Sequence, residues 1–365
     1  MRCFVVGKPI KRTSLPLEDT AWATRTGSRE IAQQAGVSEA TIDRVLHGRS
    51  GVRSSTVTEV HQAIEDLDRQ RSQLRLTGRT FMVDLVMQSP TRFSNAVRAA
   101  LEHELPTLRP AVIRSRFHLA EESDPGKVAV TLASIARRGS HGVLLKAPDD
   151  AVVVDAFAGL VDRGIPVVTL FTDVPLSRRV AYVGIDNRAA GATAAYLLTR
   201  WSPHGGTVLV TVSSSAFRGE DEREIGFRAT MRQMAPERAV REVTDTNGAD
   251  PAMLEAVTTV LEEDSTIDAV YSVGGGNAAT ALAFERAGRR VSAFIAHDLD
   301  ADNLALLRQQ RISAVLHHDL REDMRRACRL VMQAHGALPG VPHSLPSHVQ
   351  VITPFNEPRT FAGSE

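Results

Sequence analysis

The organisation of this chain is decided by SREIAQQAGVSEATIDRVLHGRSGVRSSTVTEVHQAIEDL, residues 28–67. Its first half holds two short segments whose apolar residues recur at helical spacing: Ile31, Ala32 and Ala35 in the first, and Ile42, Val45 and Leu46 in the second. Gly36 suits the left-handed position that ends a helix, and Ser38 can cap the next one. The pattern therefore predicts two helices joined by a tight turn.

A third helix is predicted directly after these two. Its apolar residues at helical spacing are Val57, Val60, Ile64 and Leu67. Thr56 and Glu59 have the spacing of a capping box at its start. Two short helices around a glycine-containing turn are typical of a helix-turn-helix domain, whose second helix lies in the major groove of DNA. Spacing alone also allows a generic helical hairpin without a DNA-binding role.

The residues of this stretch match a known pattern. The run AGVSEATIDRVLHGRSGVR, followed by Thr56, closely resembles the N-terminal domain of the lac repressor family of bacterial transcription regulators. That family has an alanine-glycine-valine-serine turn, a recognition helix of the form threonine-valine-x-arginine-valine-leucine, and an asparagine-glycine-like loop. The resemblance implies a helix-turn-helix domain over residues 28–68 and a homodimer that reads adjacent half-sites of double-stranded operator DNA.

The same resemblance implies which side chains of the recognition helix meet bases. Glu39 and Ala40 occupy the two positions that point at base edges in the family, and Arg44 matches an arginine that reaches the major groove. Glutamate can accept from cytosine N4, alanine can contact a thymine methyl group, and arginine can bind guanine in bidentate fashion. Asp43 stands where the family usually has a small residue. It either restrains Arg44 or faces solvent, and we favour solvent.

Phosphate contacts and a hinge are implied in the same way. Ser38, Thr41 and Thr56 are placed for phosphates. Residues 69–79, RQRSQLRLTGR, form a polar, arginine-rich connector, which in the family is a hinge helix that inserts a leucine into the minor groove. Leu76 stands where that leucine would be. A plain solvated linker is the alternative, because the connector is shorter than usual.

Composition places the chain among ordinary globular proteins. Its 365 residues are 43% hydrophobic and 24% charged, which excludes a disordered chain, and no apolar run approaches the roughly 18 residues of a membrane span. Residues 1–80 hold 13 Lys and Arg against 9 Asp and Glu although the net charge is zero, a bias expected where one end approaches DNA. Cys3 and Cys328 lie far apart without metal-ligand spacing, so we expect a cytoplasmic protein with no metal and no cofactor.

From Thr80 onward, short apolar runs alternate with helical segments. Runs this apolar fit strands covered on both faces, and the helices between them imply parallel crossovers. The predicted strands are 81–86, 111–117, 142–146, 166–171, 207–212, 267–273, 291–298, 312–318 and 349–353. The predicted helices include 92–105, 125–138, 187–200, 220–234, 251–263, 277–287, 300–309 and 320–335. This alternation is more than one sheet needs, so we predict two α/β lobes.

Polar residues at the ends of these strands are candidates for a pocket, because open parallel sheets bind ligands beyond the carboxyl ends of their strands. Three segments also resemble the lac repressor family: GIDNRAAGATAAYLL at 184–198, the signature from Glu222 to Phe227, and AHDLDADN at 296–303. The family shares its body with periplasmic sugar-binding proteins, which hold their ligand between two lobes. The resemblance implies that the effector is contacted by Phe93, Asp173, Arg223, Asn277, Asp298 and His318.

These side chains suit a small sugar or polyol. Carboxylates and a bidentate arginine can pair with adjacent hydroxyls, and polar groups that the wrong ligand leaves unpaired lower its affinity. Arg223 can alternatively form a salt bridge between the lobes. His318, which stands where the family commonly has glutamine, can alternatively be a satisfied histidine inside a lobe.

We therefore predict an α/β protein with an N-terminal helix-turn-helix three-helix head and a two-lobed, periplasmic-binding-protein-like sensor body. The predicted division is a flexible extension at 1–27, the head at 28–68, a hinge or linker at 69–79, the body at 80–356 and a tail at 357–365. Within the body, the first lobe covers about 80–186 and 313–338, and the second covers about 187–312 and 339–356.

The predicted function is a sequence-specific regulator of transcription, in the form of a repressor whose operator affinity changes when effector binds. A sugar-binding protein without a regulatory role and an enzyme on the same scaffold are the alternatives. The chain has no Gly-x-Ser-x-Gly motif, no phosphate loop and no metal-ligand cluster, and Gly274 to Gly276 reads as a turn at a strand end. We therefore expect no catalytic residues.

Overall fold

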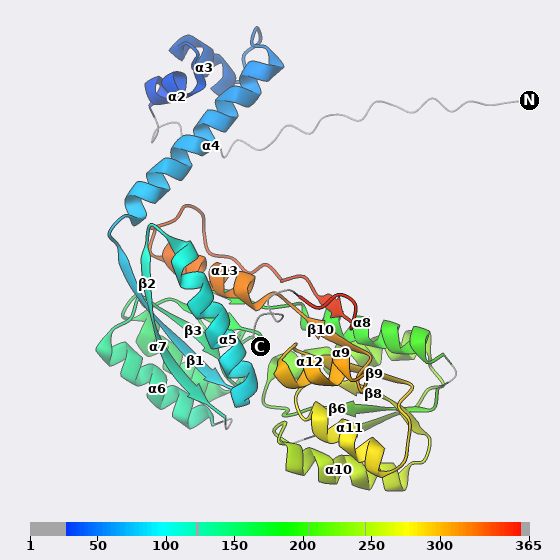
Figure 1. The fold of residues 1–365 in the computed structure, drawn as a ribbon. Coiled ribbons are helices and arrows are strands. Elements are labelled where there is room, and N and C mark those ends of the chain that lie inside the picture. The colour runs from blue at the N-terminus through cyan, green and yellow to red at the C-terminus, as the bar shows by residue number, and fades with distance from the viewer. Residues whose placement is uncertain (1–26, 122–123, 204, 245, 359–365) are drawn as a thin grey trace, which may run out of the picture. The chain divides into compact units, whose positions relative to one another are not determined.

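The computed structural model describes residues 27–121, 124–203, 205–244 and 246–358. The chain divides into two compact units, with the boundary between Arg75 and Leu76, and Figure 1 draws both. Nearly all of the predicted extension and most of the predicted tail lie outside the described residues. The head and the body are therefore described separately.

The head consists of α2 (Ser28–Ala35), α3 (Glu39–Leu46) and α4 (Ser54–Leu76). As predicted, Gly36 has a left-handed backbone with φ of 66° and ends α2. The prediction that Ser38 caps α3 is also confirmed, because its hydroxyl accepts from the backbone N–H of Thr41 at 3.2 Å. The three helices bury a small shared core made of Ile31, Ala32, Ile42, Val60 and Ile64.

Helix α4 differs from the prediction at both ends. It begins at Ser54, so Thr56 lies inside its first turn and the predicted capping box at Thr56 is wrong. It continues for 23 residues to Leu76, through most of the segment that the sequence analysis treated as a connector. Arginine, glutamine and leucine are good helix formers, and the first strong interruption is Gly78, whose φ is 76°.

The first lobe of the body is built on a parallel sheet with the strand order β2-β1-β3-β4-β5. Its strands are β1 (Thr80–Gln88), β2 (Val112–Ala120), β3 (Gly142–Lys146), β4 (Val167–Leu170) and β5 (Ala181–Val183). Helices α5 (Thr91–Glu104) and α13 (Leu320–Ala334) share a core with one face, and Figure 1 shows them side by side. Helices α6 (Pro125–Arg138) and α7 (Ala151–Val161) cover the other face, and the short 3-10 helix η1 (Leu105–Leu108) follows α5.

The second lobe is built on a sheet with the order β11-β10-β9-β8-β6-β7, parallel except for β11. Its strands are β6 (Thr207–Thr211), β7 (Val240–Val243), β8 (Ile267–Ser272), β9 (Ala293–His297), β10 (Ala314–His317) and β11 (Gln350–Ile352). One face packs on α8 (Asn187–Trp201) and α9 (Arg218–Met234). The other packs on α10 (Asp250–Glu263), α11 (Asn277–Arg286) and α12 (Ala301–Arg308).

The chain passes between the lobes in three crossing segments: residues 184–186 from β5 to α8, residues 318–319 from β10 to α13, and residues 335–349 from α13 to β11. The first and third lie side by side, because Ile185 and Ser347 form a parallel bridge. The predicted boundary at 313 is wrong by one strand, since β10 pairs with β9 and belongs to the second lobe. The second crossing therefore starts at His318.

The two predicted lobes and nearly all of their elements are confirmed. The elements that the sequence analysis did not name are the short strands β5 and β7, helix α7 and the 3-10 helix η1. Strand β5 is three residues long and β7 reads VREV, so neither has the apolar run that marks the buried strands. Both lie at sheet edges, and Arg241 and Glu242 of β7 are exposed.

Candidate functional site

In the head, helix α3 exposes the side chains that the sequence analysis expected to read bases. Ile42 is fully buried against α2 and α4, which turns Glu39, Ala40 and Arg44 to the exposed side of the helix. Ser38 and Thr41 bond to each other through their hydroxyls at 2.9 Å, and Thr56 is half-buried on α4. Leu76 is the last residue of α4. Glu39, Ala40 and Arg44 are therefore accessible on one side of α3.

The carboxylate of Asp43 contacts basic residues other than Arg44. Its carboxylate lies 2.9 Å from Nη1 of Arg49 and 3.0 Å from Nδ1 of His47, both in or near the loop after α3. The side chain is 47% exposed. Of the two roles that the sequence left open, restraint of Arg44 is therefore not supported, and the acid instead ties the end of the recognition helix to its following loop.

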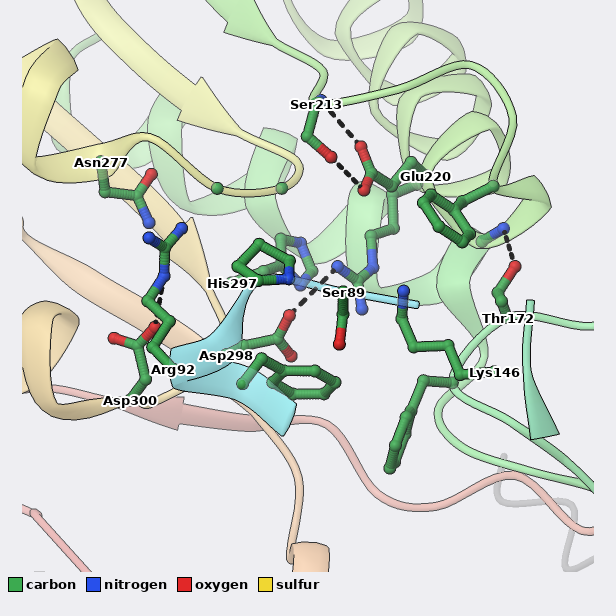
Figure 2. A pocket seen from close by; sticks show the side chains of 18 of the residues that line it. Ser89, Arg92, Lys146, Thr172, Ser213, Glu220, Asn277, His297, Asp298 and Asp300 are labelled. Carbon is green, nitrogen blue, oxygen red and sulfur yellow. Dashed lines mark hydrogen bonds and ion pairs between the residues drawn. The ribbon is translucent and has the colours of Figure 1, made fainter. Parts of the chain in front are cut away.

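In the body, one cavity lies between the carboxyl ends of the two sheets. Its space, including the opening to solvent, is about 670 Å³. Figure 2 shows side chains from both lobes converging on it. The first lobe contributes Ser89, Pro90, Arg92, Phe93, Lys146, Phe171 and Thr172. The second contributes Ser213, Phe217, Gly219, Glu220, Arg223, Gly274, Gly275, Asn277, His297, Asp298, Asp300 and Asn303.

Arg223 is placed by an unusually close contact between α8 and α9. A Cβ at Gly191 would lie 1.8 Å from the carbonyl oxygen of Arg223, and one at Gly226 would lie 2.1 Å from that of Arg188. The two glycines therefore let the helix backbones touch. Arg223 then donates from Nε to Asn187 Oδ1 at 2.8 Å and from Nη1 to the carbonyl of Val273 at 2.9 Å.

Glu220 and Lys146 form a second charged group in the cavity wall. The carboxylate of Glu220 accepts from the hydroxyl and the backbone N–H of Ser213, at 2.5 and 2.8 Å. Lys146 donates to the carbonyl of Gln88 at 3.0 Å, and its ammonium lies 3.8 Å from the centre of the Phe217 ring. Burial lowers the pKa of Lys146 to about 8, against the opposing attraction of Glu220 and Asp298.

Arg92 and Asp300 join the lobes across the cavity, with 3.0 Å between Nε and Oδ2. Figure 2 shows this ion pair beside Asn277. Asp300 also caps α12, because its other oxygen accepts from the N–H of Asn303 at 2.8 Å. Burial raises the pKa of Asp300, and Arg92 and the cap oppose that rise. A Cβ at Gly275 would lie 2.4 Å from Nη2 of Arg92, so the glycine run after β8 leaves room for this arginine.

The carboxylate of Asp298 makes only long contacts with its charged partners. It is 25% exposed, and the nearest basic nitrogens are Nη1 of Arg223 at 3.7 Å and Nε2 of His318 at 3.9 Å. Its backbone has φ of 63°, a left-handed conformation that costs a non-glycine residue free energy. Asn303 holds the turn by donating to the carbonyls of His297 and Asp298, at 2.9 and 2.7 Å. Such strain is common at ligand sites.

Four of the six predicted effector residues line the cavity, namely Phe93, Arg223, Asn277 and Asp298. Asp173 does not line it: its carboxylate is paired with Arg179 and accepts from the hydroxyl of Thr169 at 2.7 Å, so it braces the first lobe. His318 does not line it either, because the imidazole lies behind Asp298 and bonds to Asp323. These two assignments are corrected.

Several residues of the wall were not predicted. Lys146 ends the apolar run GVLLK, and a lysine at the end of a buried strand is a signal that could have been used. Arg92 lies beside the predicted Phe93, but nothing in the sequence says that it reaches Asp300. Glu220 stands in the first turn of α9, where an acid is ordinary for a helix start.

Two lobes around a polar cavity, preceded by a helix-turn-helix head, define a DNA-binding regulator with a ligand-sensing body. Residues 85–337 match the model of the periplasmic binding protein domain. Residues 29–71 match the model of the bacterial regulatory proteins of the lacI family. The chain belongs to the periplasmic binding protein domain family, and its N-terminal region makes it a regulator of the lacI family. No curated protein matches the chain.

Solved structures show the same fold for the body. A glucose-galactose binding protein, GanP, from Geobacillus stearothermophilus is 21% identical, with a TM-score of 0.69 over 77% of this chain and 99% of that one. A putative LacI transcriptional regulator from Bacteroides fragilis is 14% identical, with a TM-score of 0.67 over 76% and 98%. The arabinose binding protein AraP from Geobacillus stearothermophilus is 20% identical, with a TM-score of 0.63 over 76% and 97%.

No helix among the described residues has the length and apolar character needed to cross a membrane. No cluster of three or more histidine, cysteine or acidic side chains in the same part of the chain has the geometry of a metal site. The two matched family models describe a regulator and a binding domain.

Proposed function

We propose that this protein is a cytoplasmic, homodimeric repressor whose affinity for operator DNA is changed by a neutral sugar or polyol bound in the cavity. The observation that carries the proposal is a polar, charge-balanced cavity in the body of a chain whose head has an exposed recognition helix. The DNA-binding class follows from the family. We propose in addition that the protein represses transcription, that it forms a homodimer and that its effector is a sugar or polyol.

The charges in the cavity favour a neutral ligand. Arg92 is matched by Asp300, and the remaining two cations, Lys146 and Arg223, face the two carboxylates of Glu220 and Asp298. An anionic or cationic ligand would leave one buried charge without a counterion, which is costly in a low-dielectric site. A ligand with hydroxyl groups can bond to both signs of charge without changing the balance.

Unpaired polar atoms support a ligand that forms hydrogen bonds. Oδ1 of Asn277 and Nδ1 of His297 are buried without a partner among the described residues, and both side chains belong to the cavity wall. Leaving such atoms unpaired costs about 1–3 kcal/mol each, which a bound hydroxyl would recover. Phe93, Phe171 and Phe217 add apolar surface that suits the C–H faces of a sugar ring.

The names of similar proteins agree with this chemistry. The glucose-galactose and arabinose binding proteins have the same body fold, with their ligands stated in their names. At identities near 20% this supports only the choice of compounds to test. D-glucose, D-galactose and arabinose are the first candidates.

For the head, we propose that Glu39, Ala40 and Arg44 contact base edges in the major groove. The hydroxyls of Ser38, Thr41 and Thr56 would contact phosphates, and Leu76 would enter the minor groove at the centre of the operator. Two heads of a homodimer would read two half-sites. Effector binding would change the separation of the heads, and a coupling of about 1–3 kcal/mol would change operator affinity about 5- to 150-fold.

The test is a fluorescence-anisotropy titration of a pseudopalindrome from DNA upstream of the gene, at fixed salt, with and without each sugar. We expect sequence-specific binding that one compound changes. Asp298→Asn should abolish the response to that compound while leaving operator binding intact. Asp302→Asn, which removes an exposed carboxylate on α12, is the matched control and should respond like the wild type. Weak binding that salt abolishes and no compound changes would contradict the proposal.

A further inference from the structure

His318 lies directly behind the cavity wall, at the start of the second crossing segment. It is 1% exposed, and its ring packs 5.4 Å from that of Phe171, which lines the cavity. Nδ1 is hydrogen-bonded to Asp323 Oδ2 at 2.5 Å. Nε2 has no hydrogen-bond partner among the described residues and lies 3.9 Å from Oδ1 of Asp298. One side of the imidazole is therefore fixed, and the other side faces the carboxylate of Asp298.

The partner of His318 connects it to the other two crossing segments. Asp323, on α13 and 1% exposed, also accepts from the hydroxyl of Ser347 in the third crossing. The backbone N–H of Ser347 donates to the carbonyl of Gly184 in the first crossing at 2.8 Å. A continuous set of contacts therefore runs from Asp298 in the cavity to all three segments between the lobes.

The electrostatics around His318 favour the protonated imidazole. Burial alone would lower the pKa of His318, but the attraction and hydrogen bond of Asp323 and the attraction of Asp298 raise it above its usual value. The same pairing keeps the pKa of Asp323 low in spite of its burial. The charged or titratable groups around the imidazole are Asp323, Asp298, Arg223, His297 and His317.

Of these neighbours, the two other histidines do not compete for the proton. Burial lowers the pKa of His297 well below its usual value, and it lowers that of His317 to about 4. Both imidazoles are therefore neutral near pH 7. His318 differs from these two histidines because the buried carboxylate of Asp323 bonds to its ring and raises its pKa.

We propose that His318 is a positioning residue: anchored by Asp323, it directs a protonated nitrogen at Asp298 and so links the ligand-binding carboxylate to the segments that join the lobes. This inference rests on the proposed function only for the identity of the ligand. A histidine with a purely structural role would be satisfied on both ring nitrogens. Here the nitrogen that points toward Asp298 has no hydrogen-bond partner among the described residues.

The first test needs no ligand. In the full-length protein labelled with ¹⁵N-histidine, the ring signals of His318 are assigned by their loss in His318→Gln and followed from pH 5.5 to 9. We expect an imidazolium at pH 7. Asp298→Asn should lower the pKa of His318 by about one pH unit, because it removes a negative charge at 3.9 Å. The control Asp302→Asn removes an exposed carboxylate and should leave the pKa nearly unchanged.

The folding of Asp298→Asn is checked separately, and a second variant should change the pKa of His318 in the opposite direction. Asp298 is 25% exposed, so Asp298→Asn is expected to fold, which circular dichroism would check. Ser347→Ala removes only the hydroxyl that bonds to Asp323 and should raise the pKa of His318 slightly, because Asp323 then keeps more of its charge for the imidazole. A neutral imidazole at pH 7 in the wild type, or a pKa of His318 that Asp298→Asn does not change, would overturn the proposal.

The second test uses D-glucose, D-galactose, D-arabinose and D-allose as probes in calorimetric titrations at pH 6 and pH 9. The wild type should lose affinity about tenfold as pH rises through the pKa of His318, and by linkage the bound sugar should raise that pKa by about one unit. His318→Gln, which keeps a hydrogen-bond donor without a charge, should keep only the weaker pH dependence that Lys146, with a pKa of about 8, contributes in both proteins. His348→Gln, at an exposed histidine, is the control and should retain the wild-type profile.

The two tests separate the two proposals. If none of the four sugars binds, the proposed effector class fails, while the coupling of His318 to Asp298 is still decided by the ring titration. If a sugar binds with the same pH dependence in the wild type and in His318→Gln, the effector class stands and the positioning role of His318 is refuted.

Discussion

The contact between α8 and α9 supports the most specific prediction about stability. Gly226→Ala would place a Cβ 2.1 Å from the carbonyl oxygen of Arg188 and 2.8 Å from its carbonyl carbon. The obstacle is backbone, so no side chain can turn away to relieve it, and the two helices must separate. Arg223, one turn earlier on α9, would move with its helix away from Asn187 and Val273.

The magnitude follows from one stabilising effect and two destabilising effects. Alanine in place of glycine inside a helix stabilises by about 1 kcal/mol. Forced separation of a close-packed pair costs about 1–3 kcal/mol, and loss of part of the hydrogen bonding of a buried arginine costs a further 1–3 kcal/mol. We expect a net destabilisation of about 2 kcal/mol, or a fall in Tm of roughly 4–8 °C for a unit of this size.

The matched control is Gly159→Ala in α7. It makes the same chemical change inside a helix, but a Cβ there would have no atom within 4 Å. That variant should be as stable as the wild type or more stable by about 0.5–1 kcal/mol. Differential scanning calorimetry of the full chain compares the two. If Gly226→Ala unfolds at the temperature of Gly159→Ala or above it, the close helix contact and its role in placing Arg223 are refuted.

Three further predictions concern the head, the first sheet and the closure of the lobes. Arg44→Ala should weaken specific operator binding by about 1–3 kcal/mol and non-specific binding much less; equal losses in anisotropy titrations would remove Arg44 from the base-reading set. Asp84 is fully buried and is hydrogen-bonded to Arg116 and His118. Burial alone would raise the pKa of Asp84, but these hydrogen bonds lower it. The contribution of the Asp84 carboxylate to folding stability should therefore be present near neutral pH and lost as pH falls below about 4. Asp84→Asn should destabilise the protein by about 3–5 kcal/mol at pH 7 and flatten the acid side of a plot of Tm against pH. An unchanged acid side would contradict this. Arg92→Ala should weaken closure by removing the ion pair with Asp300, and small-angle X-ray scattering should then show a larger radius of gyration than the wild type, whereas equal radii would show that other contacts hold the lobes together.

The site shows how far strand-end reasoning reaches. Asn277 and Asp298 follow buried parallel strands, and both line the cavity as that rule predicts. Asp173 also follows a strand, yet its carboxylate turns to Arg179, six residues further along the chain. The rule identifies the correct edge of the sheet but not the direction of a side chain, because the direction depends on which cation packs nearby.

What the sequence by itself determined about this protein is local. Helical period, the left-handed glycine at Gly36 and the cap at Ser38 specify the head, since each depends on residues within a few positions of one another. Apolar runs specify the buried strands for the same reason. The extent of α4 was missed because the segment reads as a polar linker, although no helix breaker precedes Gly78.

Only the tertiary structure decided what the cavity contains. The pairing of Arg92 with Asp300 joins residues about 200 positions apart, and the position of His318 between Asp298 and Asp323 depends on β10 lying in the second sheet while α13 packs on the first. Such contacts follow from strand order and from how the lobes close. Neither leaves a periodic signal in the sequence, because the energy of an ion pair depends on distance and burial in space and not on separation along the chain.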